Sequence, residues 1–333
     1  MRERTVKVWV IPIVASLILF WILIFTIPYA RGYGWGNETL GSFLTLVWKL
    51  PDWAHGQFVP CISLGLIIWK WKEIARTPIR GNPRVGGALL LLGTFVYCIG
   101  LKAVTEYFGY TAIQILLAGV VFWFWGSSVF FKISFPWVFL FFTWPMPFLD
   151  GMLALPLRLE MSHTAHVLLN VLGTPNVQSG TAVLSAPNVA AGLETGSKFQ
   201  IDIADPCSGL HSLFALMMIS ALAAYVSLNS LFLRWVLFFC AVPLAIAGNV
   251  VRILLLVWGT EHFGSGFAIG TEENPSWFHM GCGYAVYLVA LGLLFALIQI
   301  FNSAWVTGLV AKLPSLPGVR TDEAPLPGEA RSS

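Results

Sequence analysis

Apolar stretches long enough to cross a lipid bilayer recur along the whole chain. A helix needs about 20 residues to cross the hydrocarbon core of a membrane. Of the 333 residues, 57% are hydrophobic and only 11% are charged, whereas about a quarter are charged in an average soluble domain. The predicted spans are 8–29, 55–72, 85–105, 111–131, 133–149, 209–229, 232–258 and 279–301. The sequence therefore predicts an all-α fold, a polytopic transmembrane helical bundle of about eight spans.

Two of these spans have features of their own. The first follows Arg2, Arg4 and Lys7, is too long for a typical signal-peptide core and has no small-residue cleavage site after it. We expect it to be a retained span. The fifth is short and rich in proline, so we expect it to be kinked or partly re-entrant.

Basic residues predict the orientation of the bundle. With the N-terminus in the cytoplasm, most of the 19 Lys and Arg residues lie inside, as the positive-inside rule requires. Those inside are Arg2, Arg4, Lys7, Lys70, Lys72, Arg76, Arg80, Arg84, Lys132, Arg234, Lys312, Arg320 and Arg331, and those outside are Arg31, Lys49, Lys102, Arg158 and Lys198. We therefore expect a multi-pass protein of the inner, cytoplasmic membrane.

One water-facing segment, residues 150–208, is expected on the outer side. Its first part, 151–172, has the pattern of an amphipathic helix with His163 and His166, and the alternation after it predicts a small hairpin. We expect residues 1–310 to form the transmembrane domain, with 150–208 as a small extracytoplasmic insertion. The proline-rich residues 311–333 predict a disordered cytoplasmic tail.

Several classes of function are not supported by the composition. The net charge is only +3, and the basic residues lie in short loops rather than in a stripe, so nucleic-acid binding is not expected. The cysteines are Cys61, Cys98, Cys207, Cys240 and Cys282. They show no CxxC pair and no metal-ligand spacing. We expect no cofactor, no metal site and no disulfide framework.

A candidate nucleophile, Cys207, lies in the run Asp-Pro-Cys-Ser-Gly-Leu-His at the start of the sixth span. The positive end of a helix macrodipole favours the thiolate form of a cysteine at a helix N-terminus. The alternatives are an inert membrane cysteine or a disulfide with Cys282, the other thiol near the outer face.

Arg252 lies inside the seventh span, in the run Gly-Asn-Val-Val-Arg-Ile-Leu-Leu-Leu. A charged side chain within the bilayer costs at least a few kcal/mol, so it needs a partner or a function. Asn249 lies one helical turn earlier on the same face, where it could orient the guanidinium. The alternative is an arginine that extends to the outer headgroups.

His279 opens the eighth span, which places it near the same outer face as Cys207 and Arg252. A thiol, an imidazole and a guanidinium together form the parts of a cysteine acyl-transfer site. Other imidazoles compete for the role of base, since His211 follows Cys207 by four residues, and His55 and His262 also lie at outer span ends. Chemistry alone does not select among them.

Short motifs around these residues resemble the exosortase/archaeosortase family of multi-pass membrane cysteine transpeptidases. The chain has Cys207-Ser208-Gly209-Leu210 for the family's Cys-Ser/Ala-Gly-Leu/Ile motif, Asn249-Val250-Val251-Arg252 for its Asn-x-x-Arg motif, and His279 at the last span. His55-Gly56 is similar to its His-Gly segment, and Pro145-Met146-Pro147 to its Pro-x-Pro stretch. The resemblance covers about residues 50–300.

This resemblance implies that Cys207 is the nucleophile, that Arg252 and His279 complete its site, and that His211 lies outside the catalytic set. The substrates it implies are secreted proteins with a C-terminal, PEP-CTERM-like sorting signal, which contains a short motif, one transmembrane helix and a basic cluster. The implied reaction forms a thioacyl-enzyme, which an unidentified amine acceptor resolves. Membrane lipid surrounds the bundle.

Two other functions are open at this point. A transporter or flippase would use Arg252 to bind an anionic substrate, with Cys207 incidental. A non-catalytic assembly subunit would tolerate loss of Cys207. The chain has no internal repeat and its candidate residues cluster at one outer face, which counts against a transporter.

Overall fold

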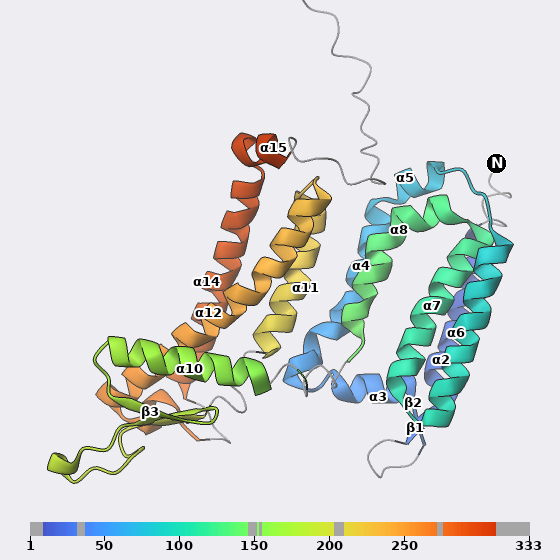
Figure 1. The fold of residues 1–333 in the computed structure, drawn as a ribbon. Coiled ribbons are helices and arrows are strands. Elements are labelled where there is room, and N and C mark those ends of the chain that lie inside the picture. The colour runs from blue at the N-terminus through green and yellow to red at the C-terminus, as the bar shows by residue number, and fades with distance from the viewer. Residues whose placement is uncertain are drawn as a thin grey trace, which may run out of the picture.

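The computed structural model describes residues 9–31, 37–145, 152, 155–202, 210–271 and 276–310. Helices make up most of these residues, and Figure 1 shows them in two groups. The first group contains α2 (Ile11–Phe25), α3 (Leu40–Val47), α4 (Val59–Trp69), α5 (Trp71–Arg76), α6 (Pro83–Ala103), α7 (Glu106–Phe124) and α8 (Ser127–Phe139), with the 3-10 helices η2 (Pro51–Phe58) and η3 (Leu140–Thr143). The second contains α10 (Leu155–Val171), α11 (Leu210–Ser227), α12 (Leu231–Phe263), α13 (Ser265–Ala268), α14 (Trp277–Phe301) and α15 (Ala304–Val310).

The predicted polytopic helical membrane fold is confirmed. Four helices, α6, α7, α12 and α14, are long and apolar enough to cross a membrane. Four shorter apolar helical stretches, 11–25, 53–69, 127–143 and 213–227, fall within the other predicted spans or overlap them. Hydrocarbon offers no hydrogen-bond partners to the backbone, and helices satisfy their backbone groups internally.

The predicted boundary between the fourth and fifth spans, near Lys132, is wrong. Helix α7 ends at Phe124 and α8 begins at Ser127, so Lys132 lies within α8. The turn is at Gly126, whose φ of 82° is in the left-handed region, and a Cβ there would lie 1.8 Å from the Arg80 carbonyl oxygen. Only glycine fits this turn. Hydropathy could not locate it because the residues on both sides are apolar.

Helices α6 and α7 form a closely packed hairpin. A Cβ added at Gly93 would lie 2.7 Å from Leu116, and one added at Gly119 would lie 3.0 Å from Leu90. Small residues at such positions let two membrane helices approach closely and gain van der Waals contact. Asn82 caps the start of α6 by accepting a hydrogen bond from the backbone N–H of Val85 at 3.2 Å.

A buried glutamine connects α7 to the end of the fifth apolar stretch. The Gln114 side chain donates to the Trp137 carbonyl, and its Oε1 accepts from Trp144 Nε1 at 3.2 Å. The backbone carbonyl of Gln114 accepts from Trp137 Nε1 at 2.9 Å. The polar side chain is therefore satisfied within the bundle. These bonds hold the residues just before Pro145, and the rest of the Pro-x-Pro stretch lies outside the described residues.

Aromatic contacts join the two groups of helices. Trp53 of η2 stacks on Phe214 of α11 with ring centroids 5.1 Å apart, and Phe135 of α8 stacks on Tyr225 of α11 at 3.8 Å. The first contact lies near the start of α11 and the second near its end, so α11 is fastened to the first group at both ends.

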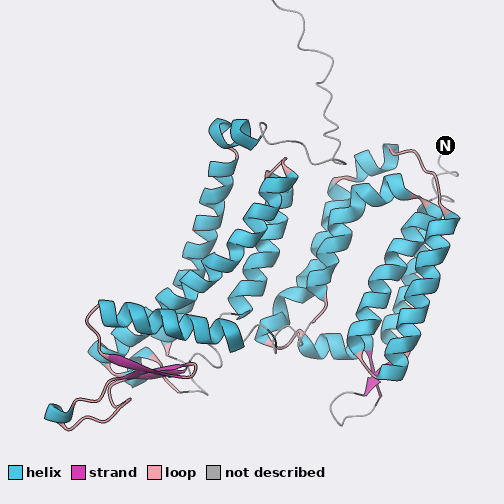
Figure 2. Ribbon diagram, in the orientation of Figure 1, coloured by secondary structure: helices cyan, strands magenta, loops and turns pink. Residues whose placement is uncertain are grey.

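Short strands lie at one end of the molecule, where Figure 2 shows both small sheets. The predicted helix and hairpin of the insertion are present as α10 and the antiparallel pair β3 (Asn176–Ser179) and β4 (Ala182–Ser185), and β5 (Gln200–Asp202) adds a third strand. A second pair, β1 (Pro28–Arg31) and β2 (Asn37–Thr39), was not predicted. The predicted tail at 311–333 lies outside the described residues.

Candidate active site

Arg252 and His279 meet where α12 packs against α14. Nη2 of Arg252 lies 2.8 Å from Nε2 of His279. A guanidinium has no acceptor, so it donates this hydrogen bond and Nε2 accepts it. An imidazole that accepts at Nε2 carries its proton on Nδ1, so the contact selects this neutral tautomer of His279.

Burial argues against the alternative in which Arg252 extends to the outer headgroups. His279 is only 6% exposed, and Arg252 is half-buried. Among the residues that the structure describes, the buried Nε of Arg252 meets no hydrogen-bond acceptor. Because the end of the side chain contacts a buried imidazole, the guanidinium points into the bundle rather than out to the membrane surface.

The start of α14 holds His279 in place through its N-cap. Ser276 Oγ accepts from the backbone N–H of His279 at 3.0 Å and donates to the Ala268 carbonyl at 3.0 Å. A serine N-cap satisfies one of the free N–H groups in the first turn of a helix. The same serine also fastens α14 to α13, so the position of the imidazole depends on two helices.

Asn249 is buried on α12, and its side chain contacts α10. Its amide nitrogen lies 3.0 Å from Sδ of Met161 in α10. Met161 belongs to a cluster of apolar residues that α10, α12 and strands β4 and β5 share. Asn249 thus links α12 to the helix that crosses its end, and its role in orienting the guanidinium stays a prediction.

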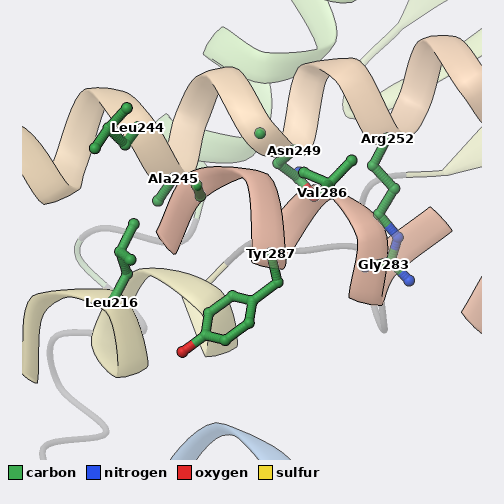
Figure 3. A pocket seen from close by; sticks show the side chains of 10 residues that line it. Leu216, Leu244, Ala245, Asn249, Arg252, Gly283, Val286 and Tyr287 are labelled. Carbon is green, nitrogen blue, oxygen red and sulfur yellow. The ribbon is translucent and has the colours of Figure 1, made fainter. Parts of the chain in front are cut away.

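A small cavity of about 40 Å³ adjoins Arg252 (Figure 3). It lies between α11, α12 and α14 and is lined by Leu216, Leu244, Ala245, Gly248, Asn249, Arg252, Gly283, Val286, Tyr287 and Ala290. This volume is enough for a water molecule where polar groups can bind it. Arg252 and Asn249 supply such groups at one end.

The other sequence candidates fall in different places. Cys207 lies outside the described residues, three positions before α11 begins at Leu210, and the side chain of His211 is likewise not described. His55 is half-buried in η2, which contacts α11 through the stacked pair Trp53 and Phe214. His262 is exposed, and its Nδ1 donates to the Trp258 carbonyl at 2.9 Å. Cys282 is a buried free thiol in α14.

Sequence reasoning missed Gly283 and Tyr287, which line the cavity. A Cβ added at Gly283 would lie 3.4 Å from Cζ of Arg252, so this glycine leaves room for the guanidinium. Both residues follow His279 at intervals of four, which puts them near its face of the helix. That spacing was available in the sequence, whereas the contact of Met161 with Asn249 was not.

Comparison with known families identifies the family of this chain. The family model of the transmembrane exosortases (Exosortase_EpsH) matches residues 47–296. The chain belongs to the transmembrane exosortase family. No curated protein and no solved structure matches it. The matched region of the exosortase runs from the last residue of α3 into α14 and contains Cys207, Arg252 and His279.

Family membership gives this multi-pass membrane protein a transmembrane exosortase role. Exosortases are generally cysteine transpeptidases, and their substrates are proteins that carry sorting signals. The family model does not assign the catalytic residues of this exosortase.

Proposed function

We propose that this exosortase is a membrane-embedded cysteine transpeptidase. It cleaves the C-terminal sorting signals of secreted proteins and transfers the cleaved proteins to an amine acceptor. The observation that carries the proposal is the hydrogen bond between Arg252 and His279 across α12 and α14. These helices pack with α11, and the chain that enters α11 carries Cys207. The three residues of the matched motifs therefore belong to three neighbouring helices or their immediate ends.

In the first step, Cys207 loses its proton to His279 and attacks the scissile carbonyl. Nε2 of His279 accepts from Arg252 in this structure, so it takes up the thiol proton only when the guanidinium releases it. The released guanidinium can then donate to the oxyanion of the tetrahedral intermediate. One hydrogen bond thus links the two roles, because freeing the base also frees the group that stabilises charge.

Collapse of the intermediate breaks the scissile C–N bond, and the imidazolium returns its proton to the leaving amine. The products of this step are a thioester at Cys207 and the free anchor helix. In the second step an amine acceptor attacks the thioester, a new amide forms, its surplus proton passes through His279, and the thiol is restored. The enzyme therefore gains and loses no net proton over the two steps.

We place the reaction at the outer face of the inner membrane. Helix α10 and strands β3–β5 lie at the same end of α12 as Asn249 and Arg252, since Met161 contacts Asn249. Helix α5, which carries Lys72 and Arg76, lies at the other end of the molecule in Figure 1. This supports α10 and β3–β5 as part of an extracytoplasmic insertion, and we propose residues 150–208 as that insertion within a transmembrane domain at 1–310.

Orientation is tested by labelling spheroplasts with a membrane-impermeant maleimide in a background without native cysteines. We expect Ser197→Cys, in the exposed insertion, to react and Lys72→Cys, on α5, to react only after the membrane is opened. The reverse pattern would move the proposed site to the cytoplasm and remove the case for a secreted substrate.

The cysteine mechanism is tested with Cys207→Ala, which we expect to insert and fold normally but to release no anchor peptide. The matched control is Cys61→Ala, which removes an exposed free thiol of α4 and should leave processing intact. The readouts are trapped thioester and released anchor peptide in the same membranes. Normal processing by Cys207→Ala would refute the proposal.

The choice of imidazole is tested by comparing His279→Ala with His211→Ala in that assay. We expect His279→Ala to remove thioester formation and transfer, because His279 contacts Arg252, and His211→Ala to keep at least partial activity. Acylation that survives in His279→Ala and is absent in His211→Ala would reverse the assignment.

A further inference from the structure

A second cationic cluster lies at the other end of α12, around the ring of Tyr225. Phe135 stacks on this ring with centroids 3.8 Å apart and planes only 3° from parallel. Lys70 Nζ lies 4.7 Å from the ring centroid, and Arg234 Cζ lies 5.2 Å from it. Both cations therefore lie beside the same aromatic ring.

The helices around this cluster add to its positive charge. Arg234 is in the first turn of α12, where the macrodipole is positive and a cation is unfavourable. Ser230, the N-cap of α12, makes no side-chain hydrogen bond to the first turn. Two cations and the positive end of a long helix thus converge on one place.

Nothing in the described part of the chain neutralises this charge. The guanidinium of Arg234 uses Nε to donate to the Leu228 carbonyl at 2.7 Å, which leaves its terminal nitrogens for another acceptor. Glu73, the nearest carboxylate in sequence to Lys70, is exposed on α5. Within the described ranges, no carboxylate forms an ion pair with Lys70 or Arg234. The cluster has donors and charge for an anion.

Its surroundings are those of a membrane boundary. Lys70 follows α4 directly, Tyr225 is near the end of α11, and Arg234 is near the start of α12. Apolar side chains beside the cluster are open to lipid, since Trp69 is 60% exposed, Leu231 50% and Phe232 53%. An anion bound here would have a polar head between half-buried cations and apolar chains along exposed helix surface.

We propose that Lys70 and Arg234 bind the phosphate of an anionic phospholipid headgroup, at the end of the bundle opposite Arg252 and His279. Phosphate oxygens accept from the terminal nitrogens of Arg234 and from Nζ of Lys70. Basic pockets between membrane helices bind lipid headgroups in this way. The site lies where α8 of the first group meets α11 of the second, so the bound lipid joins the two groups. This proposal does not depend on the catalytic one.

The test measures retained lipid by native mass spectrometry on the full-length protein, offered phosphatidylglycerol or phosphatidylcholine. We expect wild type to retain phosphatidylglycerol preferentially, and Lys70→Gln or Arg234→Gln to weaken that retention about fivefold each, from about 1 kcal/mol per cation. Lys132→Gln is the matched control, since it removes one positive charge from an exposed position of α8. It should retain lipid as wild type does.

Equal loss in Lys132→Gln, or no loss in Lys70→Gln, would overturn the proposal. Lys70→Gln is the decisive variant because Arg234→Gln also breaks the hydrogen bond to Leu228. A second arm adds inorganic phosphate to the protein in phosphatidylcholine nanodiscs and follows thermal unfolding. We expect the melting temperature to rise with phosphatidylglycerol and not with free phosphate. An equal rise with free phosphate would exclude a lipid as the specific ligand.

Discussion

Helix α12 carries an arginine in each of its two halves, and the two are held by different kinds of partner. Arg234 donates to the carbonyl of Leu228 and lies over the ring of Tyr225. Arg252 donates to Nε2 of His279, an imidazole nitrogen that can accept a proton in a reaction. The same side chain on the same helix therefore anchors at one end and is placed for proton chemistry at the other.

We expect the largest effect on anchor release from His279→Ala. It removes both the proton carrier and the acceptor of Arg252, so we expect a loss of about 10²–10⁴-fold in anchor release. His262→Ala is the control, because His262 is exposed and donates to the Trp258 carbonyl within its own helix. Release at the wild-type rate in His279→Ala would place the reaction away from this pair.

The second effect comes from exchanging each arginine of α12 for lysine. Arg252→Lys keeps the charge and loses the planar fork, and we expect release to fall about 10²–10³-fold, as for loss of an oxyanion donor. Arg234→Lys should stay within about twofold, because it keeps the charge at the end of α12 away from His279. Similar losses in both variants, measured in the same membranes, would erase the distinction between the two ends.

The third effect concerns the space that Gly283 leaves beside the guanidinium. A Cβ there would lie 3.4 Å from Cζ of Arg252, which is ordinary contact. We expect Gly283→Ala to be nearly neutral, whereas Gly283→Val adds branches that displace the guanidinium and lowers release by about 10²-fold. Initial rates with unchanged protein levels are the measurement. Equal rates in the two variants would show that the position of Arg252 over Gly283 is unimportant.

The smallest effect compares two serine N-caps. Ser276 at the start of α14 accepts from the His279 N–H, whereas Ser230 at the start of α12 makes no such bond. We expect Ser276→Ala to lower the free energy of unfolding by about 1 kcal/mol and Ser230→Ala to leave it almost unchanged. Chemical denaturation in the same detergent checks both, and equal losses would contradict the assigned caps.

Much of the fold was predictable because it depends on local patterns. Runs of apolar residues of membrane length predicted the spans, and the alternation at 177–184 predicted the strands β3 and β4. The break at Gly126 and the pair β1–β2 were missed. Gly126 turns the chain because the Arg80 carbonyl leaves no room for a side chain, and no residue near Gly126 in the sequence carries that information.

For the site, the residue types and their order could be read from the sequence. Three short motifs, in the order found in the exosortases, pointed to Cys207, Arg252 and His279 before any contact was known. Gly283 and Tyr287 also follow His279 at intervals of four along α14, but this signal was missed.

The hydrogen-bond partner of each polar side chain depends on how the helices pack. The sequence allowed Arg252 to reach the headgroups, Asn249 or an imidazole, and it allowed four histidines to serve as the base. The packing of α12 against α14 put Nη2 of Arg252 at 2.8 Å from Nε2 of His279, and α10 put Met161 beside Asn249. The reason is physical: apolar burial depends on local residue type and period, whereas a hydrogen bond depends on atomic distance and angle between elements far apart in the chain.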